Sequence, residues 1–362
     1  MNLFYHQLNN KFFNLNFILN SYNYFRYVTD MLLNGMVSNT LENIEARLYT
    51  ELNASVRCQF IPVLDGQAHL WTVTVCKNEA DDDYFARPPM VLLHGFGSGS
   101  AMWLKNFEAL SEKRVVYSLD LLGKGFGRSS RIQFSQDSVA AENMWIKSIE
   151  DWRHFMKLNN FYLLGHAFGG YLAAAYVLEY PTHVNHLLLV DPWGFAEKPD
   201  EQESSNSTPM WISSITGFFN SCNPLSLIRL VGPAAPSLIR KLRPDIGTKY
   251  FEHEKMQRLL YNYLYLINMP EPTGESAFRS ISVPFGWAKR PMVKRLPLMS
   301  RNIPITFIHG SRSWVDQKPG ITIQKLLSNK TSVRVEIVRA AGHHVYADQP
   351  CAFNELVQSC VE

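Results

Sequence analysis

The stretch Phe161-Tyr162-Leu163-Leu164-Gly165-His166-Ala167-Phe168-Gly169-Gly170 decides the fold of this chain. It reads as an apolar strand, a tight turn and the beginning of a helix. This is the layout of a nucleophile elbow, G-x-S-x-G, in which the central residue attacks the substrate. The central position here holds Ala167, and a methyl group has no lone pair with which to attack a carbonyl. The stretch therefore predicts an elbow that has lost its nucleophile.

Residues 90–97 form a second signal, a strand that runs into the glycine-rich turn His94-Gly95-Phe96-Gly97. In a hydrolase with such an elbow, this turn supplies one backbone N–H of the oxyanion hole. We expect Phe96 to provide that group and Phe168, the residue after the elbow position, to provide the second.

The remaining members of a catalytic triad follow in order along the chain. Asp316 lies in the loop after the strand-like run 305–309, and His343 follows the last such run, 333–338. Asp191, which follows another strand, is the competing candidate for the acid. The order elbow, acid, histidine is the chain order of an α/β-hydrolase. The sequence thus predicts the α/β-hydrolase fold, with a mostly parallel sheet, helices on both faces and an inserted cap.

The rhythm of strands and helices divides the chain into four parts. Residues 1–37 are an aromatic extension, and 38–55 include an amphipathic helix capped by Ser38. The hydrolase core takes up 56–192 and 297–362. Residues 193–296 are rich in prolines and break the β/α rhythm, which predicts a cap inserted after a core strand.

Composition limits the functions that this chain can have. Its 362 residues suit one large α/β domain with an insertion, and 46% hydrophobic residues are ample for a core. A net charge of +3 gives no bulk attraction to nucleic acid. The five cysteines are scattered without C-x-x-C spacing, which argues against a zinc site and for a reducing compartment. We expect neither a metal nor a cofactor.

The first 35 residues carry nine aromatic side chains and only three charged ones. Asparagines interrupt every apolar run, which is unlike a signal peptide. Aromatic rings with polar edges suit a lipid–water boundary. The alternative interpretation is a disordered or untranslated extension, with Met31 or Met36 as the true start.

Several longer stretches resemble one abhydrolase-domain group. It contains the lipid-droplet coactivator of adipose triglyceride lipase and its sister, a lysophospholipase that acts on N-acyl phospholipids. The matching stretches cover roughly residues 50–360. They are Leu92-Leu93-His94-Gly95-Phe96-Gly97, Gly127-Arg128-Ser129-Ser130, Asp191-Pro192-Trp193-Gly194-Phe195, Leu242-Arg243-Pro244-Asp245, Phe285-Gly286-Trp287-Ala288-Lys289-Arg290-Pro291-Met292 and Gly342-His343-His344-Val345-Tyr346-Ala347-Asp348-Gln349-Pro350.

The resemblance implies a function without hydrolysis. The sister enzyme has serine at the elbow and the coactivator has asparagine, so Ala167 places this chain on the non-hydrolytic side. The expected function is that of a catalytically silent protein on the lipid-droplet surface and in the cytoplasm. Its expected partners are a triglyceride lipase, which it activates or recruits, and droplet-coat proteins. An acyl lipid is a further candidate ligand.

The group also has an H-x-x-x-x-D motif, here His343 to Asp348, proposed for acylation of lysophosphatidic acid. A His–Asp pair can act as a general base on a substrate hydroxyl without a protein nucleophile. A lipid acyltransferase, or a residual phospholipid hydrolase that uses His343, is therefore the alternative function. The other interpretation is that His343 is the relic triad base and Asp348 begins the last helix, where an acid suits the helix dipole.

Two further residues are candidates for contact with a partner. Arg312 lies in the loop after one strand and Gly342 in the loop after the next. Arginine binds carboxylates and phosphates through two parallel hydrogen bonds, and glycine allows another backbone to approach closely. The alternatives are that Arg312 pairs within the protein and that Gly342 only shapes the turn before His343.

Overall fold

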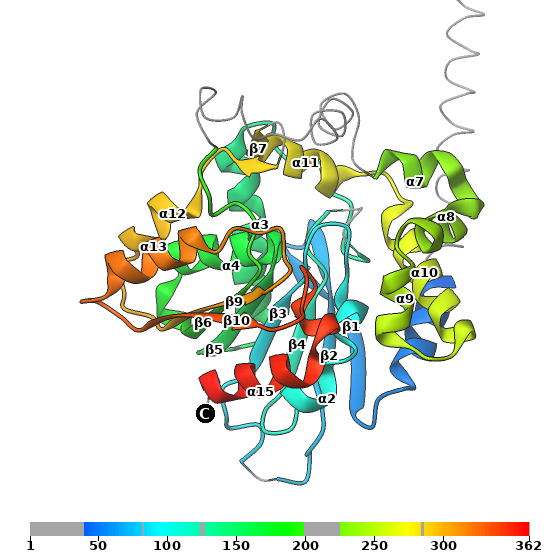
Figure 1. Ribbon diagram of the computed structural model, residues 1–362, viewed down its shortest axis with the longest axis horizontal. Coiled ribbons are helices and arrows are strands. Elements are labelled where there is room, and N and C mark those ends of the chain that lie inside the picture. The colour runs from blue at the N-terminus through cyan, green and yellow to red at the C-terminus, as the bar shows by residue number, and fades with distance from the viewer. Residues whose placement is uncertain (1–39, 82, 124–126, 199–224, 284–285, 362) are drawn as a thin grey trace, which may run out of the picture. The chain divides into compact units, whose positions relative to one another are not determined.

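The computed structural model describes residues 40–81, 83–123, 127–198, 225–283 and 286–361. Eight strands form one sheet in the order β1-β2-β4-β3-β5-β6-β9-β10 (Figure 1). Their bounds are Ser55–Val63 (β1), Ala68–Cys76 (β2), Met90–Leu93 (β3), Val116–Leu119 (β4), Phe161–His166 (β5), Val184–Val190 (β6), Ile305–Gly310 (β9) and Val333–Val338 (β10).

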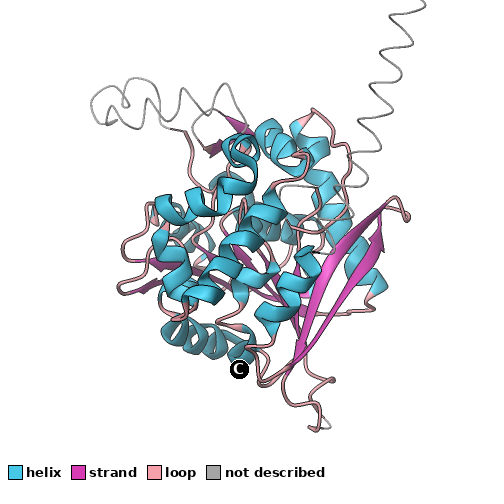
Figure 2. Ribbon diagram, turned by 90° about the vertical axis from the view of Figure 1, so that its right-hand side faces the viewer, coloured by secondary structure: helices cyan, strands magenta, loops and turns pink. Residues whose placement is uncertain are grey.

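Most neighbouring strands of this sheet are parallel. Only the pairs β1–β2 and β2–β4 are antiparallel, and β1 and β2 form the long hairpin ribbon of Figure 2. In the parallel part, β5 lies between β3 and β6, and Leu93 pairs in register with Gly165. The turn after β3 and the elbow after β5 therefore leave the sheet at the same edge.

Helices cover both faces of the sheet, as expected for a parallel sheet that is buried on both sides. Helix α3 shows how the sequence pattern produces this, because its Trp145, Ile149 and Trp152 recur on one side and are all buried. Helices α3, α4, α12 and α13 lie on one face, and α2 and α15 on the other (Figure 1). Their bounds are Phe107–Leu110 (α2), Ser138–Phe155 (α3), Phe168–Glu179 (α4), Met292–Arg295 (α12), Lys318–Leu327 (α13) and Pro350–Val361 (α15).

Between β6 and β9 the described residues add no strand to the main sheet. They form a group of helices and a two-stranded ribbon in the region that the sequence assigns to a cap. The helices are Ser226–Val231 (α7), Ala235–Leu242 (α8), Pro244–Tyr250 (α9), Glu254–Asn268 (α10) and Thr273–Ile281 (α11), and the ribbon pairs Ser282–Val283 (β7) with Trp287–Ala288 (β8). The shorter elements of the chain are α14 (Val345–Asp348), η1 (Ser100–Trp103), η2 (Pro181–His183), η3 (Gly232–Ala234) and η4 (Leu296–Leu298).

The helix expected from Ser38 to Asn53 is shorter in the structure, which shows residues 40–49 as helical. The boundary between two compact units of the chain falls within this helix, between Ile44 and Glu45. Within the larger unit, Glu45 is buried and its carboxylate pairs with Arg128 at 2.7 Å. Glu45 therefore does not contribute an exposed negative charge to this helix.

The predicted α/β-hydrolase fold is confirmed, and the predicted strands and helices match to within a few residues at most ends. No helix of the described ranges is both long and apolar enough to span a membrane. The cap stretch that holds the apolar residues Trp211, Ile212, Ile215, Phe218 and Phe219 lies outside the described residues, as do residues 1–39.

Candidate functional site

The elbow keeps its strained backbone although it carries no nucleophile. Ala167 has φ 50° and ψ −113°, a conformation that L residues rarely adopt and that costs about 1–3 kcal/mol. Backbone hydrogen bonds hold it there: Ala167 N–H donates to the carbonyl of Val190 at 3.0 Å, and Trp193 N–H donates to the Ala167 carbonyl at 3.0 Å. The turn therefore stays sharp because β6 and the segment after it fix its backbone on both sides.

Two glycines permit the close approach that this turn requires. A Cβ atom on Gly165 would lie 2.3 Å from the carbonyl oxygen of Gly169, and one on Gly169 would lie 2.4 Å from that of Leu93. Neither backbone neighbour can yield by that much. The G-x-A-x-G spacing is thus a packing requirement of the strand–turn–helix unit, independent of the residue at its centre.

A histidine and an aspartate are paired beside the elbow. The Nδ1 atom of His343 lies 3.3 Å from Oδ2 of Asp191, which directly follows β6. The other oxygen, Oδ1, lies 3.0 Å from Nδ1 of His309 at the end of β9. Asp191 is fully buried and has φ 41°, so a second strained residue belongs to this site.

Asp316 was the first candidate for the acid, and the structure corrects this. Its carboxylate is exposed and accepts a hydrogen bond from the backbone N–H of Lys318 at 2.9 Å, in the turn that begins α13. Asp191, the competing candidate, is the residue that orients His343.

Hydrogen bonds keep the buried Asp191 carboxylate ionised. Burial by itself would raise its pKa, but hydrogen bonds from His309, His343 and Ser313 outweigh burial and lower the pKa below its ordinary value. A buried carboxylate that accepts from two imidazoles fixes their ring orientations. His343 is thereby held in the tautomer that leaves Nε2 as a base.

A cluster of histidine rings surrounds this pair. The His343 ring centroid lies 4.7 Å from that of His166 and 5.4 Å from that of His344. Nε2 of His166 lies 3.0 Å from the backbone carbonyl of His343. Burial and the neighbouring histidines lower the pKa of His166 well below its ordinary value, and burial, His343 and nearby cations lower that of His344 to about 3. Both rings are therefore neutral at physiological pH.

The turn that carries Phe96 lies against the elbow. A Cβ atom on Gly95 would be 3.2 Å from the methyl carbon of Ala167. The rings of Phe96 and Phe168 both contact Phe278 of α11, at centroid distances of 4.8 and 5.0 Å. The two residues predicted for the oxyanion hole thus both lie beside the elbow and contact the same cap residue, Phe278. Their role in binding an oxyanion stays a prediction.

The H-x-x-x-x-D motif does not form a histidine–aspartate pair in the structure. Asp348 ends the short helix α14, and its Oδ2 accepts a hydrogen bond from Gly342 N–H at 2.7 Å. Its Oδ1 lies 2.5 Å from Nζ of Lys249 in cap helix α9. His343 pairs with Asp191 instead, which agrees with its interpretation as the relic triad base, whereas Asp348 lies two residues before the last helix rather than at its start.

The two candidate contact residues lie in adjoining loops. Arg312 has an exposed side chain, and its backbone N–H donates to the carbonyl of Ala341 at 2.8 Å, next to Gly342. Trp314, in the same loop as Arg312, is 72% exposed and packs its ring 5.1 Å from that of His343. Sequence patterns did not single out Trp314 or His309, since neither lies in a recognisable motif.

Chemically, this arrangement provides a general base, an apolar surrounding and no nucleophile. The described residues contain no group of three or more histidine, cysteine or acidic side chains arranged to hold a metal ion.

Asp191 could have been placed first from the sequence, because it directly follows its strand and Asp316 lies several residues after the end of β9.

Comparison with known proteins agrees with the fold. A family model described as alpha/beta hydrolase fold matches residues 88–350. Abhydrolase domain-containing protein lid-1 of Caenorhabditis elegans is 44% identical over 322 residues, which cover 89% of this chain and 88% of that protein. The human (lyso)-N-acylphosphatidylethanolamine lipase is 39% identical and is covered to 90%, with 88% of this chain aligned. The rat 1-acylglycerol-3-phosphate O-acyltransferase ABHD5 is 44% identical, with 80% of each chain covered.

Among solved structures, a naproxen esterase from Bacillus subtilis has a TM-score of 0.61 at 14% identity, and the alignment covers 91% of this chain and 98% of that one. A bacterial membrane phospholipase A has a TM-score of 0.60 at 19% identity, with 96% and 97% covered. At these identities the likeness shows the fold alone. Together with the curated relatives, it shows that this chain belongs to the α/β-hydrolase family, in the abhydrolase-domain group of lipid metabolism that includes lid-1, ABHD5 and the (lyso)-N-acylphosphatidylethanolamine lipases.

Proposed function

We propose that this protein works without hydrolysis, as a lipid-droplet protein that activates or recruits a triglyceride lipase. One observation carries the proposal: Ala167 occupies a strained elbow whose histidine–aspartate pair is otherwise retained. Acyl transfer through the enzyme requires an atom that donates an electron pair, and the methyl group of Ala167 has none. The scaffold is thus suited to binding lipid or a partner rather than to turning over an ester.

The relatives support the lipid side of this proposal. Their names record an acyltransferase for 1-acylglycerol-3-phosphate and a lipase for N-acylphosphatidylethanolamine, both of which act on acylated glycerophospholipids. The apolar surroundings of the elbow, where Phe278 packs on Phe96 and Phe168, suit an acyl chain. The lipase partner itself is inferred from the group that the chain resembles.

Contact with the lipase is assigned to the loops at the carboxyl ends of the strands. Ligands and partners of open α/β sheets bind at this edge. Arg312 and Trp314 both present exposed side chains there, and arginine and tryptophan are the residue types that dominate binding energy at protein interfaces.

Association with the droplet is assigned to residues 1–35. They carry nine aromatic side chains, which partition favourably into a lipid–water interface. The competing site is the cap, where Trp211, Phe218 and Phe219 are backed in the sequence by Arg229, Arg240, Lys241 and Arg243. Three of these four basic residues pair with acidic ones, since Arg229, Arg240 and Arg243 pair with Glu275, Glu254 and Asp245, while Lys241 is exposed. These three arginines are already neutralised within the cap.

A flotation experiment tests both assignments. Purified protein is mixed with phospholipid-coated triolein droplets and a triglyceride lipase, and the buoyant fraction is assayed for each protein. The full chain should float and should increase the amount of floating lipase. A truncation that begins at Met36 should float less. Equal flotation of the truncated chain would refute the N-terminal assignment, and unchanged lipase in the droplet fraction would refute recruitment.

The intact His343–Asp191 pair favours one second function, the acylation of a lysophospholipid hydroxyl by an acyl thioester. The hydroxyl oxygen would attack the thioester carbon while His343 accepts its proton, the C–S bond would break, and the proton would pass to the thiolate. Incubation with lysophosphatidic acid and acyl-CoA tests this. Product formed by the wild type and lost in His343→Gln supports acyltransfer, and equal product from both proteins excludes His343 as the base.

A further inference from the structure

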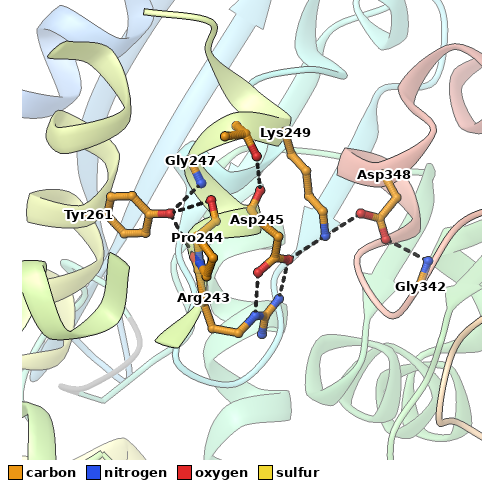
Figure 3. Close-up of polar contacts among 9 residues, drawn as sticks. Arg243, Pro244, Asp245, Gly247, Lys249, Tyr261, Gly342 and Asp348 are labelled. Carbon is orange, nitrogen blue, oxygen red and sulfur yellow. Dashed lines mark hydrogen bonds and ion pairs between the residues drawn. The ribbon is translucent and has the colours of Figure 1, made fainter. Parts of the chain in front are cut away.

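A chain of alternating charges joins the cap to the loop that carries His343. Figure 3 shows the guanidinium of Arg243 paired with Asp245, at 2.9 and 3.0 Å. Asp245 in turn pairs with Lys249, one helical turn later in α9, at 2.8 Å. Lys249 then reaches out of the cap to Asp348, at 2.5 Å. The chain ends on the backbone N–H of Gly342, which donates to Asp348.

The cap end of this chain is firmly placed. Tyr250, the last residue of α9, is buried and its hydroxyl donates to the carbonyl of Met102 at 2.5 Å. The hydroxyl of Tyr261 accepts a hydrogen bond from Gly247 N–H at 2.9 Å and lies 2.8 Å from the carbonyl of Arg243 (Figure 3). Helix α9 therefore holds Lys249 in position without needing the ion pair to Asp348.

Several hydrogen bonds hold the loop end, and one of them involves a residue that also pairs with the cap. Arg312 N–H donates to Ala341, and His166 bonds to the carbonyl of His343, both from the core. Another bond runs from Gly342 N–H to Asp348, and Asp348 also pairs with Lys249 of the cap. The backbone of Gly342, next to His343, is thus coupled to α9 through the Asp348 carboxylate.

We propose that Lys249 and Asp348 form a latch through which the cap positions the Gly342–His343 loop. In this role the aspartate of the H-x-x-x-x-D motif is a positioning residue that joins cap and core, not a partner of the histidine in catalysis. A displacement of α9 would release Asp348 and with it the backbone of Gly342. This inference concerns the geometry of the loop and stands apart from the proposed lipase partner.

The ion pair is placed to have a measurable effect. The Asp348 side chain is 9% exposed and that of Lys249 is 26% exposed, so solvent screens the pair only in part. Burial would lower the pKa of Lys249, but its bonds to Asp245 and Asp348 outweigh burial and raise the pKa. Lys249 is therefore charged across the physiological pH range.

Hydrogen–deuterium exchange of the full-length protein tests the latch. Lys249→Met keeps the aliphatic stem and removes the charge. We expect amide exchange in residues 340–346 to rise about tenfold, equivalent to about 1.4 kcal/mol, with an unchanged melting temperature. Lys241→Met, at an exposed lysine of neighbouring α8, is the matched control and should leave the loop unchanged. Equal exchange in the two variants would overturn the proposal.

A double-mutant cycle separates a latch from two independent stabilising groups. Asp348→Asn retains an oxygen that can accept from Gly342 N–H but removes the charge that attracts Lys249. The combined variant Lys249→Met with Asp348→Asn should exchange no faster than Asp348→Asn alone. Lys249→Arg, which can still pair with Asp348, should restore wild-type protection. Additive effects in the double variant, or faster exchange in Lys249→Arg, would contradict the latch.

Discussion

Nδ1 of His343 lies 3.3 Å from Oδ2 of Asp191, beside an elbow whose apex is Ala167. The pair is maintained by the fold rather than by any need to activate a serine, because Asp191 also bonds to His309 and is fixed at the end of β6. The site therefore keeps the histidine–aspartate pair of a hydrolase while its elbow carries a methyl group.

Wild-type protein should not react with a fluorophosphonate probe at this site. Such probes report an activated serine, and the elbow methyl group has no electron pair to attack phosphorus. Ala167→Ser should gain labelling on the peptide 161–170, since the strained turn, the His343–Asp191 pair and the adjacent Gly95 turn are all in place. Gel fluorescence and peptide mapping measure both, and a labelled elbow peptide in wild-type protein would contradict the account.

Asp191 should be required for the labelling gained by Ala167→Ser. In a serine protease the change from aspartate to asparagine lowers kcat about 10⁴-fold, because the histidine is held in the wrong tautomer. The variant Ala167→Ser with Asp191→Asn should thus be unlabelled at the times when Ala167→Ser is labelled. Asp316→Asn in the same background is the matched control. Loss of labelling with Asp316→Asn and its retention with Asp191→Asn would reverse the assignment of the acid.

Much of this site was predictable from the sequence because each motif follows a strand. The elbow, the Gly95 turn and His343 lie where a parallel sheet brings the ends of β5, β3 and β10 to one edge. The acid was harder to place, since two aspartates follow strands, and only the directness with which Asp191 follows β6 favours it in the sequence.

The contacts of Asp348 were out of reach of sequence patterns. Lys249 is about a hundred positions earlier in the chain, and nothing in its surroundings marks it as a partner of the histidine loop. The pairing depends on how α9 packs beside α14, which is set by buried residues such as Tyr250 and Tyr346 rather than by a local motif.

Arg312→Ala should weaken stimulation of the lipase without loss of stability. The side chain is exposed, and such substitutions change the free energy of unfolding by less than about 0.5 kcal/mol. A hot-spot arginine at an interface contributes more than about 1 kcal/mol, so at least about fivefold more protein should be needed for half-maximal stimulation. Arg87→Ala, before β3 at the opposite edge of the sheet, is the control. An identical dose response for Arg312→Ala and wild type would exclude Arg312 as a contact.

The free energy of unfolding should decrease as the pH is lowered, and part of this decrease should come from His344. Its pKa in the folded protein is about 3, lowered by burial, His343 and the cations Arg243 and Lys249, against about 6.5 when unfolded. Below pH 6.5 the unfolded chain therefore binds a proton that the folded chain does not, and stability falls by up to about 1.4 kcal/mol per pH unit.

Replacement of this histidine should remove its share of the pH dependence. Urea unfolding of wild type and His344→Gln between pH 7 and pH 5 measures it. The difference in unfolding free energy between the two should shrink as pH falls, because the variant has no imidazole to protonate. A difference that stays constant over this range would show that His344 titrates alike in both states.

Fatty-acid release from emulsified triglyceride tests most directly whether this protein stimulates a triglyceride lipase without hydrolysing lipid itself. Three samples are assayed. They are a purified triglyceride lipase alone, the lipase with a saturating amount of this protein, and this protein alone. We predict no release by the protein alone and a several-fold faster release by the mixture than by the lipase alone. Release by the protein alone, or an unchanged lipase rate at saturation, would contradict the account.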